Sequence, residues 1–266
     1  MDKVITCFNK RPDALVCLIC FPRAGGGSVH YARWAKTLTN SFEVYSVRLP
    51  GREGRAKKPF YRNMQEIICE VIGVILPQLK EKPFALFGHS FGAMTCFAFA
   101  EHVKKVYNLE PIHMFLSGAS APYSEARLQA PRRSHLSDQE FLVWVTSVGG
   151  TPPEILASAE FAKLFLPALK ADLCVAENYR CSRPSTPILS CPVSCLDGKE
   201  DAPHDLQALV ICATVQMLPG THFYLKEDAN EKYILDYITK HLEMAEMDYL
   251  YKPCLFYYLT ANMMYL

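Results

Sequence analysis

The sequence lacks an excess of charge of either sign. It has 28 Lys and Arg residues against 27 Asp and Glu, for a formal net charge of +1. This balance gives no indication of a nucleic-acid-binding protein or of a polyanionic partner. Residues 1–10 also lack the charged start, apolar run and cleavage site of a secretion signal. No apolar run is long enough for a membrane-spanning helix, so a cytosolic location is expected.

Internal repeats and low-complexity linkers are absent, and 266 residues suit one α/β domain. Cysteine, by contrast, is abundant, with 11 residues, most of them inside apolar runs. Cys17 and Cys20 form a C-x-x-C within a predicted strand, which would point the two side chains to opposite faces and prevent a shared metal. We therefore expect free thiols in a reducing compartment and no metal site.

Apolar runs and helical periodicities alternate along the chain. Short apolar runs bounded by proline or glycine are typical of buried strands, and they occur at residues 15–21, 42–47, 84–87, 113–116 and 187–196. Apolar residues at helical spacing predict helices at residues 64–79, 91–106 and 231–247. Strand and helix in alternation predict an α/β fold with a mainly parallel sheet.

One segment, at about residues 122–185, interrupts this alternation. It contains helical patterns at 138–148 and 154–165 but no clear strand. We interpret it as a lid inserted into a single domain of residues 1–243, since such insertions often shape the mouth of a pocket. The alternative is a helical subdomain that only covers apolar sheet. The tail at residues 244–266 reads neither as a membrane span nor as a good helix, because Lys252 and Pro253 interrupt its aromatic residues.

A G-x-S-x-G motif at residues 88–92 places Ser90 between the predicted strand 84–87 and the predicted helix 91–106. A nucleophile elbow of the α/β-hydrolase fold requires this context, because its serine occupies a strained strand-to-helix turn and the glycines relieve crowding. The helix N-terminus also favours the negative charge that develops in acyl transfer. The alternative is a glycine-rich turn without chemistry.

A serine nucleophile needs a base, and in this fold the chain order is serine, acid, histidine. His222 lies in a loop after a short strand and before the last predicted helix, which suits the base. Three carboxylates could provide the acid, namely Asp197, Glu200 and Asp201. A residue in the loop past the strand end can reach back to the histidine, which favours Glu200 or Asp201 without separating them.

Glycines at residues 25–27 follow the first predicted strand, where hydrolases of this fold place a loop that donates backbone N–H groups to the oxyanion. A phosphate-binding loop is the alternative interpretation. Neither a P-loop lysine nor the spacing of a dinucleotide fingerprint follows, which argues against it.

With these motifs together, the chain resembles the type II thioesterases. The resembling segments run nearly from end to end: F-P-x-A-G-G-G at 21–27, Trp34, R-L-P-G-R-E at 48–53, P-F at 83–84, F-G-H-S at 87–90, L-S at 136–137, G-G-T-P at 149–152, A-D-L at 171–173, G-K-E-D at 198–201 and G-T-H-F-Y-L at 220–225. Two positions depart from the family: Phe91 replaces its usual methionine, and Arg23 lies where its members vary.

The resemblance implies a triad of Ser90, Asp201 and His222, with the backbone N–H groups of Ala24 and Phe91 as oxyanion donors. It implies an α/β-hydrolase fold with a lid at about 122–185 and no cofactor. The implied reaction is hydrolysis of medium- to long-chain fatty-acyl thioesters on the acyl carrier protein of a fatty acid synthase, releasing free fatty acid. A carboxylesterase or lipase with the same triad, or a non-catalytic acyl-binding relative, remains an alternative.

Two further sets of residues follow from this interpretation. Apolar residues of the predicted lid should line an acyl tunnel, and they are Phe141, Val145, Ile155, Leu156 and Phe165. A basic cluster should attract an acidic acyl carrier protein, and it consists of Arg48, Arg52, Arg55, Lys57 and Lys58. Alternatively, Arg52 and Glu53 form a structural pair, and Lys57 and Lys58 are ordinary solvated surface.

Overall fold

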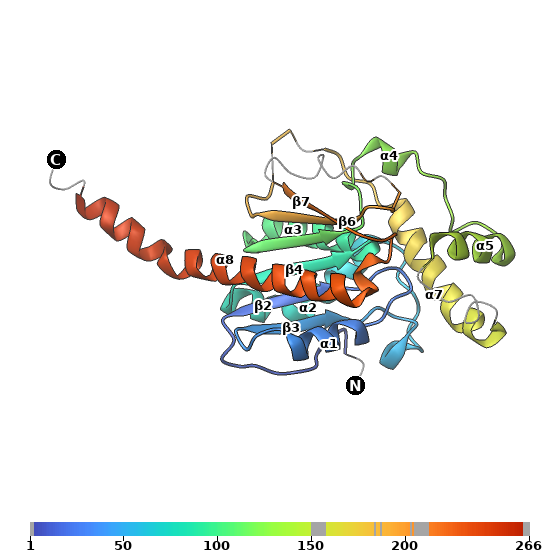
Figure 1. Ribbon diagram of the computed structural model, residues 1–266, viewed down its shortest axis with the longest axis horizontal. Helices are drawn as coiled ribbons and strands as arrows, with labels where there is room; N and C mark the ends of the chain where they lie inside the picture. Colours follow the sequence, from blue (N-terminus) through green and yellow to red (C-terminus); the bar gives the residue numbers. More distant parts are fainter. Residues whose placement is uncertain are drawn as a thin grey trace.

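The computed structural model describes residues 3–149, 158–183, 185–186, 188–202, 204 and 213–262 (Figure 1). Side chains at 159, 161, 213 and 248–262 are not described. A seven-stranded sheet forms its centre, in the order β1-β3-β2-β4-β5-β6-β7. Its strands are β1 (Ile5–Cys7), β2 (Val16–Phe21), β3 (Phe42–Val47), β4 (Phe84–His89), β5 (His113–Ser117), β6 (Val193–Gly198) and β7 (Ala213–Leu218).

All neighbouring strands are parallel except for the edge strand β1, which pairs antiparallel with β3. The helices are α1 (Val29–Thr37), α2 (Met64–Glu81), α3 (Phe91–Tyr107), α4 (Glu125–Leu128), α5 (Asp138–Val148), α7 (Ala159–Asn178) and α8 (Asp228–Asn262). Two short 3-10 turns are η1 (Glu53–Arg55) and η2 (Tyr224–Lys226). The predicted α/β architecture with a mainly parallel sheet is therefore confirmed.

Both faces of the sheet are covered, because alternate residues of each strand point to opposite sides. Cys17 and Ile19 of β2 join the core cluster that contains α2 and α3, whereas Leu18 and Cys20 join the cluster that contains α1 and α8. Cys17 and Cys20 thus lie on opposite faces, as predicted. All nine cysteines whose side chains the structure describes are free.

The helical insertion between β5 and β6 comprises α4, α5 and α7, which gather at one end of the domain (Figure 1). The predicted helix at 138–148 coincides with α5. The helix predicted to end at residue 165 instead continues through Pro167 to Asn178 as α7. A proline inside a helix removes one backbone hydrogen bond but need not end the helix.

The same effect makes one half of the interpretation of the tail wrong, namely that it is not a good helix. Residues 244–262 are helical, because α8 continues through Pro253 and ends at Asn262. This helix extends well beyond the sheet (Figure 1). Among the residues that the structure describes, no helix combines the length and apolar character needed to cross a membrane.

Candidate active site

The turn between β4 and α3 has the geometry of a nucleophile elbow. Ser90 has φ 56° and ψ −116°, a conformation that is strained for a residue with a side chain. A Cβ on Gly92 would lie 2.2 Å from the carbonyl oxygen of Phe21, and a Cβ on Gly88 would lie 2.2 Å from the backbone of Gly92. Both positions therefore require glycine, and the turn presents Ser90 at the end of β4.

Three residues from three different strand ends form one hydrogen-bonded chain. His222 Nε2 lies 3.1 Å from Ser90 Oγ, and His222 Nδ1 lies 2.7 Å from Asp201 Oδ2. Ser90 follows β4, Asp201 follows β6, and His222 follows β7. In a parallel sheet these carboxyl ends meet at the same edge, which brings the side chains together. The arrangement can remove a proton from the serine hydroxyl and stabilise the resulting imidazolium.

The three carboxylates near the end of β6 have different partners. Glu200 accepts a hydrogen bond from the Gly220 N–H, and Asp197 accepts one from the Gly198 N–H at 2.9 Å. Asp201 is the carboxylate that reaches His222. Burial raises the pKa of Asp201, but the hydrogen bond and charge of His222 outweigh it, so its pKa lies below the usual range. Asp201 is therefore ionised at neutral pH.

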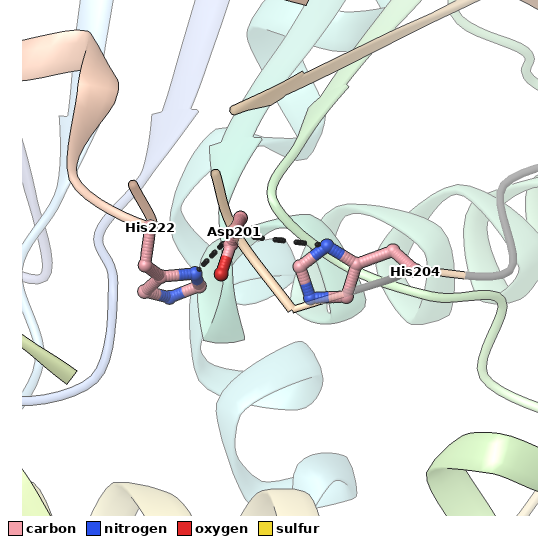
Figure 2. A group of neighbouring side chains, drawn as sticks. All are labelled: Asp201, His204 and His222. Atoms are coloured by element: carbon pink, nitrogen blue, oxygen red, sulfur yellow. Dashed lines mark hydrogen bonds and ion pairs between the residues drawn. The ribbon is translucent and has the colours of Figure 1, made fainter. Parts of the chain in front are cut away.

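A second histidine, which the sequence analysis does not single out, lies beside this acid (Figure 2). His204 Nδ1 is 2.8 Å from Asp197 Oδ2 and 3.8 Å from Asp201 Oδ2. Burial lowers its pKa, but the hydrogen bond and charge of Asp197 outweigh that and raise it above the ordinary value. The sequence signal that could have identified His204 is its position, three residues after Asp201.

The same group is the one place in the described part of the chain where metal-ligating side chains cluster. Potential ligand atoms of Asp201, His204 and His222 lie within 4.8 Å of one another. A metal bound to these three side chains would displace two hydrogen bonds, the one between His222 and Asp201 and the one between His204 and Asp197. The geometry favours the hydrogen-bonded arrangement.

Two backbone N–H groups near the serine are available as donors, since Ala24 lines the same cavity as Ser90 and Phe91 follows it in the chain. The N–H groups of Ala24 and Phe91 donate no hydrogen bond to any described residue. The neighbouring Gly25 N–H donates to Asp172 Oδ2 of α7 at 2.8 Å. Arg52 donates to both oxygens of the same carboxylate, at 2.6 and 2.9 Å. Asp172 therefore ties the loop that contains Ala24 to the helical insertion and to the R-L-P-G-R-E segment.

The arginines of the basic cluster are all paired with carboxylates. Arg48 pairs with Glu53 at 3.0 Å, and Arg55 pairs with Glu70 at 2.7 Å. The alternative that Arg52 pairs with Glu53 is wrong, because Arg52 is held by Asp172 from a helix far along the chain. Lys57 and Lys58 are exposed.

A cavity of about 420 Å³ adjoins the serine. Ser90, His222, Val145 and Phe165 line it, together with Arg23, Trp144, Leu169 and Leu173. The prediction for Phe141 differs from the structure, since its side chain is fully buried in the core and packs at a tilt against Trp144, with ring centroids 5.4 Å apart. Ile155 and Leu156 lie outside the described residues.

Known proteins share both the sequence and the fold. The sequence model of the thioesterase domain family matches residues 17–242. "S-acyl fatty acid synthase thioesterase, medium chain" from Rattus norvegicus is 39% identical over 92% of this chain and 95% of its own length. The protein of that name from Homo sapiens is 38% identical over 92% of this chain and 94% of its own.

Solved structures of thioesterases also match the fold of this chain. The type II thioesterase BorB from the borrelidin biosynthetic cluster superposes with a TM-score of 0.75 at 30% identity, covering 90% of this chain and 97% of its own. RedJ from Streptomyces coelicolor, a thioesterase of the prodiginine pathway, superposes with a TM-score of 0.78 at 28% identity, covering 87% of this chain and 88% of its own. The α/β-hydrolase fold is thereby confirmed. The chain belongs to the thioesterase family, a family of serine hydrolases that cleave acyl thioesters.

Proposed function

We propose that this thioesterase releases medium- to long-chain fatty acids from acyl carrier protein by way of an acyl-enzyme on Ser90. The observation that carries the proposal is the continuous chain from Ser90 through His222 to Asp201, which opens onto a cavity lined largely by apolar side chains. The relatives named as fatty acid synthase thioesterases support the choice of a fatty-acyl thioester.

In the first half of the reaction, Ser90 Oγ attacks the thioester carbonyl carbon and its proton passes to His222 Nε2. The N–H groups of Ala24 and Phe91 stabilise the oxyanion that forms. Collapse of this intermediate breaks the carbon–sulfur bond, and His222 returns the proton to the departing thiol. Asp201 keeps His222 in the tautomer protonated at Nδ1 and stabilises its charged form.

In the second half, His222 removes a proton from a water molecule, which attacks the acyl-enzyme. The carbon–oxygen bond to Ser90 breaks, its oxygen regains a proton from His222, and the fatty acid leaves. We propose that the insertion of α4, α5 and α7 acts as a lid at about residues 122–185, since Val145 and Phe165 from it line the cavity beside Ser90.

We place the reaction in the cytosol. The nine described cysteines are free, and most are buried, which suits a reducing compartment. We assign the docking role of the basic cluster to Lys57 and Lys58, because both side chains are exposed.

The test compares three substrates with the same acyl chain: a thioester on acyl carrier protein, a small soluble thioester and an oxygen ester. We expect the carrier-bound thioester to have the highest kcat/KM. Ser90→Ala and His222→Ala should each lower kcat by about 10⁴-fold or more, and together hardly further, because the residues act as a unit. Preference for the oxygen ester would favour a carboxylesterase. Full activity of Ser90→Ala would refute the mechanism.

A further inference from the structure

The mechanism above leaves two groups beside the triad without a role, Asp197 and His204. Asp197 lies near the end of β6, and its side chain is only 4% exposed. Its Oδ1 accepts a hydrogen bond from the Gly198 N–H at 2.9 Å, and its Oδ2 accepts one from His204 Nδ1 at 2.8 Å. A buried carboxylate needs such partners, because an ionised group away from water is costly. Asp197 and His204 thus form a second histidine–aspartate pair beside that of the triad.

This second pair also reaches the acid of the triad. His204 Nδ1 lies 3.8 Å from Asp201 Oδ2, the same oxygen that lies 2.7 Å from His222 Nδ1. Figure 2 shows the two imidazoles on opposite sides of Asp201. Their ring centroids are 6.1 Å apart, and both side chains line the catalytic cavity. One carboxylate oxygen therefore serves two imidazoles, of which His222 contacts Ser90.

The surroundings of His204 favour its charged form. Burial lowers its pKa, but the hydrogen bond and charge of Asp197, followed by the charge of Asp201, raise the pKa above the ordinary value. Burial raises the pKa of Asp201, whereas His222 and then the charge of His204 lower it. The described titratable and charged groups around His204 come from β4, from the ends of β6 and β7, from the oxyanion loop (the loop that contains Ala24) and from the helical insertion; they are His89, Asp197, Asp201, His222, Arg23 and Arg133.

From this geometry we propose that His204 is a positioning residue of the triad, which with Asp197 holds Asp201 in place and competes with His222 for its negative charge. The proposal rests on the proposed function, because His204 acts through the triad. His204 connects the end of β6 to the loop that follows it, and so fixes the orientation of Asp201. Its positive charge also opposes protonation of His222, so that the base is available at a lower pH.

The first measurement is the pH profile of kcat/KM on a small soluble acyl thioester, because its acid limb reports the base of the free enzyme. His204→Gln keeps a hydrogen-bond donor for Asp197 but removes the charge. We expect it to move the acid limb upward by at least about 0.5 pH unit, the effect of two unit charges about 6 Å apart in water. His204→Lys restores a positive charge and should move the limb back toward its wild-type position.

His102→Gln is the matched control, since it removes an imidazole of α3 that lies outside the catalytic cavity, and it should leave the acid limb unmoved. Thermal unfolding verifies that each variant is folded, and EDTA in every buffer removes trace metal. An unmoved acid limb in His204→Gln, even with a lower kcat or Tm, would reduce His204 to a structural role and overturn the proposal. A shift that His204→Lys does not reverse would overturn it as well.

The second measurement titrates His204 directly, by nuclear magnetic resonance of its imidazole in the whole protein, with the signal assigned by its loss in His204→Gln. We expect a pKa above the ordinary value of about 6.5, and Asp197→Asn should lower it by about 1 unit or more. If Asp197→Asn does not fold, the wild-type titration decides alone. A pKa at or below the ordinary value in the wild type would contradict the proposal.

The assay of Ser90→Ala separates this proposal from the proposed function. If Ser90→Ala is inactive and His204→Gln has the wild-type pH profile, the triad stands and the role of His204 is wrong. If Ser90→Ala is fully active, the triad itself is wrong, and the role of His204 is overturned with it.

Discussion

Removing the negative charge of Asp172 should impair catalysis from a distance. Its carboxylate accepts two hydrogen bonds from Arg52 and one from the Gly25 N–H. Asp172→Asn keeps the shape of the side chain but removes its charge and one acceptor. Arg52 then remains as a buried cation, and the loop that contains Ala24 loses its attachment to α7.

The burial of the Arg52–Asp172 pair determines how much stability the substitution should cost. The side chains of Arg52 and Asp172 are only 10% and 9% exposed, and breaking a buried pair of this kind typically costs about 3–5 kcal/mol. In a domain of this size, 3 kcal/mol corresponds to a fall in Tm of about 6–12 °C. Loss of an oxyanion donor lowers kcat by about 10²–10³-fold, so displacement of Ala24 should cost up to about 10²-fold.

The assay measures kcat and KM on a small soluble acyl thioester, with Tm recorded in parallel. We expect kcat to fall and KM to change little, because the oxyanion exists only in the transition state. Glu70→Gln is the matched control, since it breaks the ion pair in which one Arg55 nitrogen donates to both Glu70 oxygens but touches no part of the oxyanion loop. It should lower Tm without lowering kcat. Wild-type kcat in Asp172→Asn, or equal losses of kcat in both variants, would refute the reasoning.

Three further predictions address the remaining parts of the site. The pKa of His204 is raised in the folded protein, so the stabilisation from its ion pair is complete below the unfolded pKa of about 6.5 and is lost as the pH rises through the folded pKa. His204→Gln should therefore lower Tm more at pH 5.5 than at pH 8.5, and an equal fall at both would contradict this. Val145→Phe should shift preference toward shorter acyl chains, while Val143→Phe, on the exposed face of α5, should not; identical chain-length profiles would leave the lid as mere cover. Reversing Lys57 and Lys58 to Glu should raise KM several-fold for carrier-bound substrate only, and high salt should act alike; equal changes on a small thioester would rule out docking.

The parts of the fold that follow from local patterns were predictable. The buried strand 16–21 is a continuous apolar run, the strands 42–47 and 113–117 are mainly apolar, and the elbow combines such a strand, a glycine pair and a helix within a few residues. The short helix α1 and the edge strand β1 were missed, because nine and three residues carry too little periodicity. The ends of α7 and α8 were misplaced, since prolines signal a break that packing and the remaining hydrogen bonds can override.

The candidate site divides in the same way. Ser90 and His222 could be found from their place relative to predicted strands, but Asp201 and Glu200 could not be separated by spacing. The hydrogen bond from His222 reveals the difference, since a single step along the loop turns one carboxylate toward the imidazole and the other toward Gly220. Arg52 and Asp172 are 120 positions apart in the chain, so no local sequence pattern could predict that they pair.

The attachment of Gly25 to α7 also couples access to the site with its competence. If α7 swings outward as a rigid rod, the Asp172 carboxylate leaves with it, and the donor loop is released from its position. A wide opening on this side would therefore leave the proposed oxyanion site incomplete. An acyl chain that entered there would have to wait for α7 to return before the first bond could break. The hydrogen bond from Gly25 to Asp172 would thus make the return of α7 a condition of catalysis.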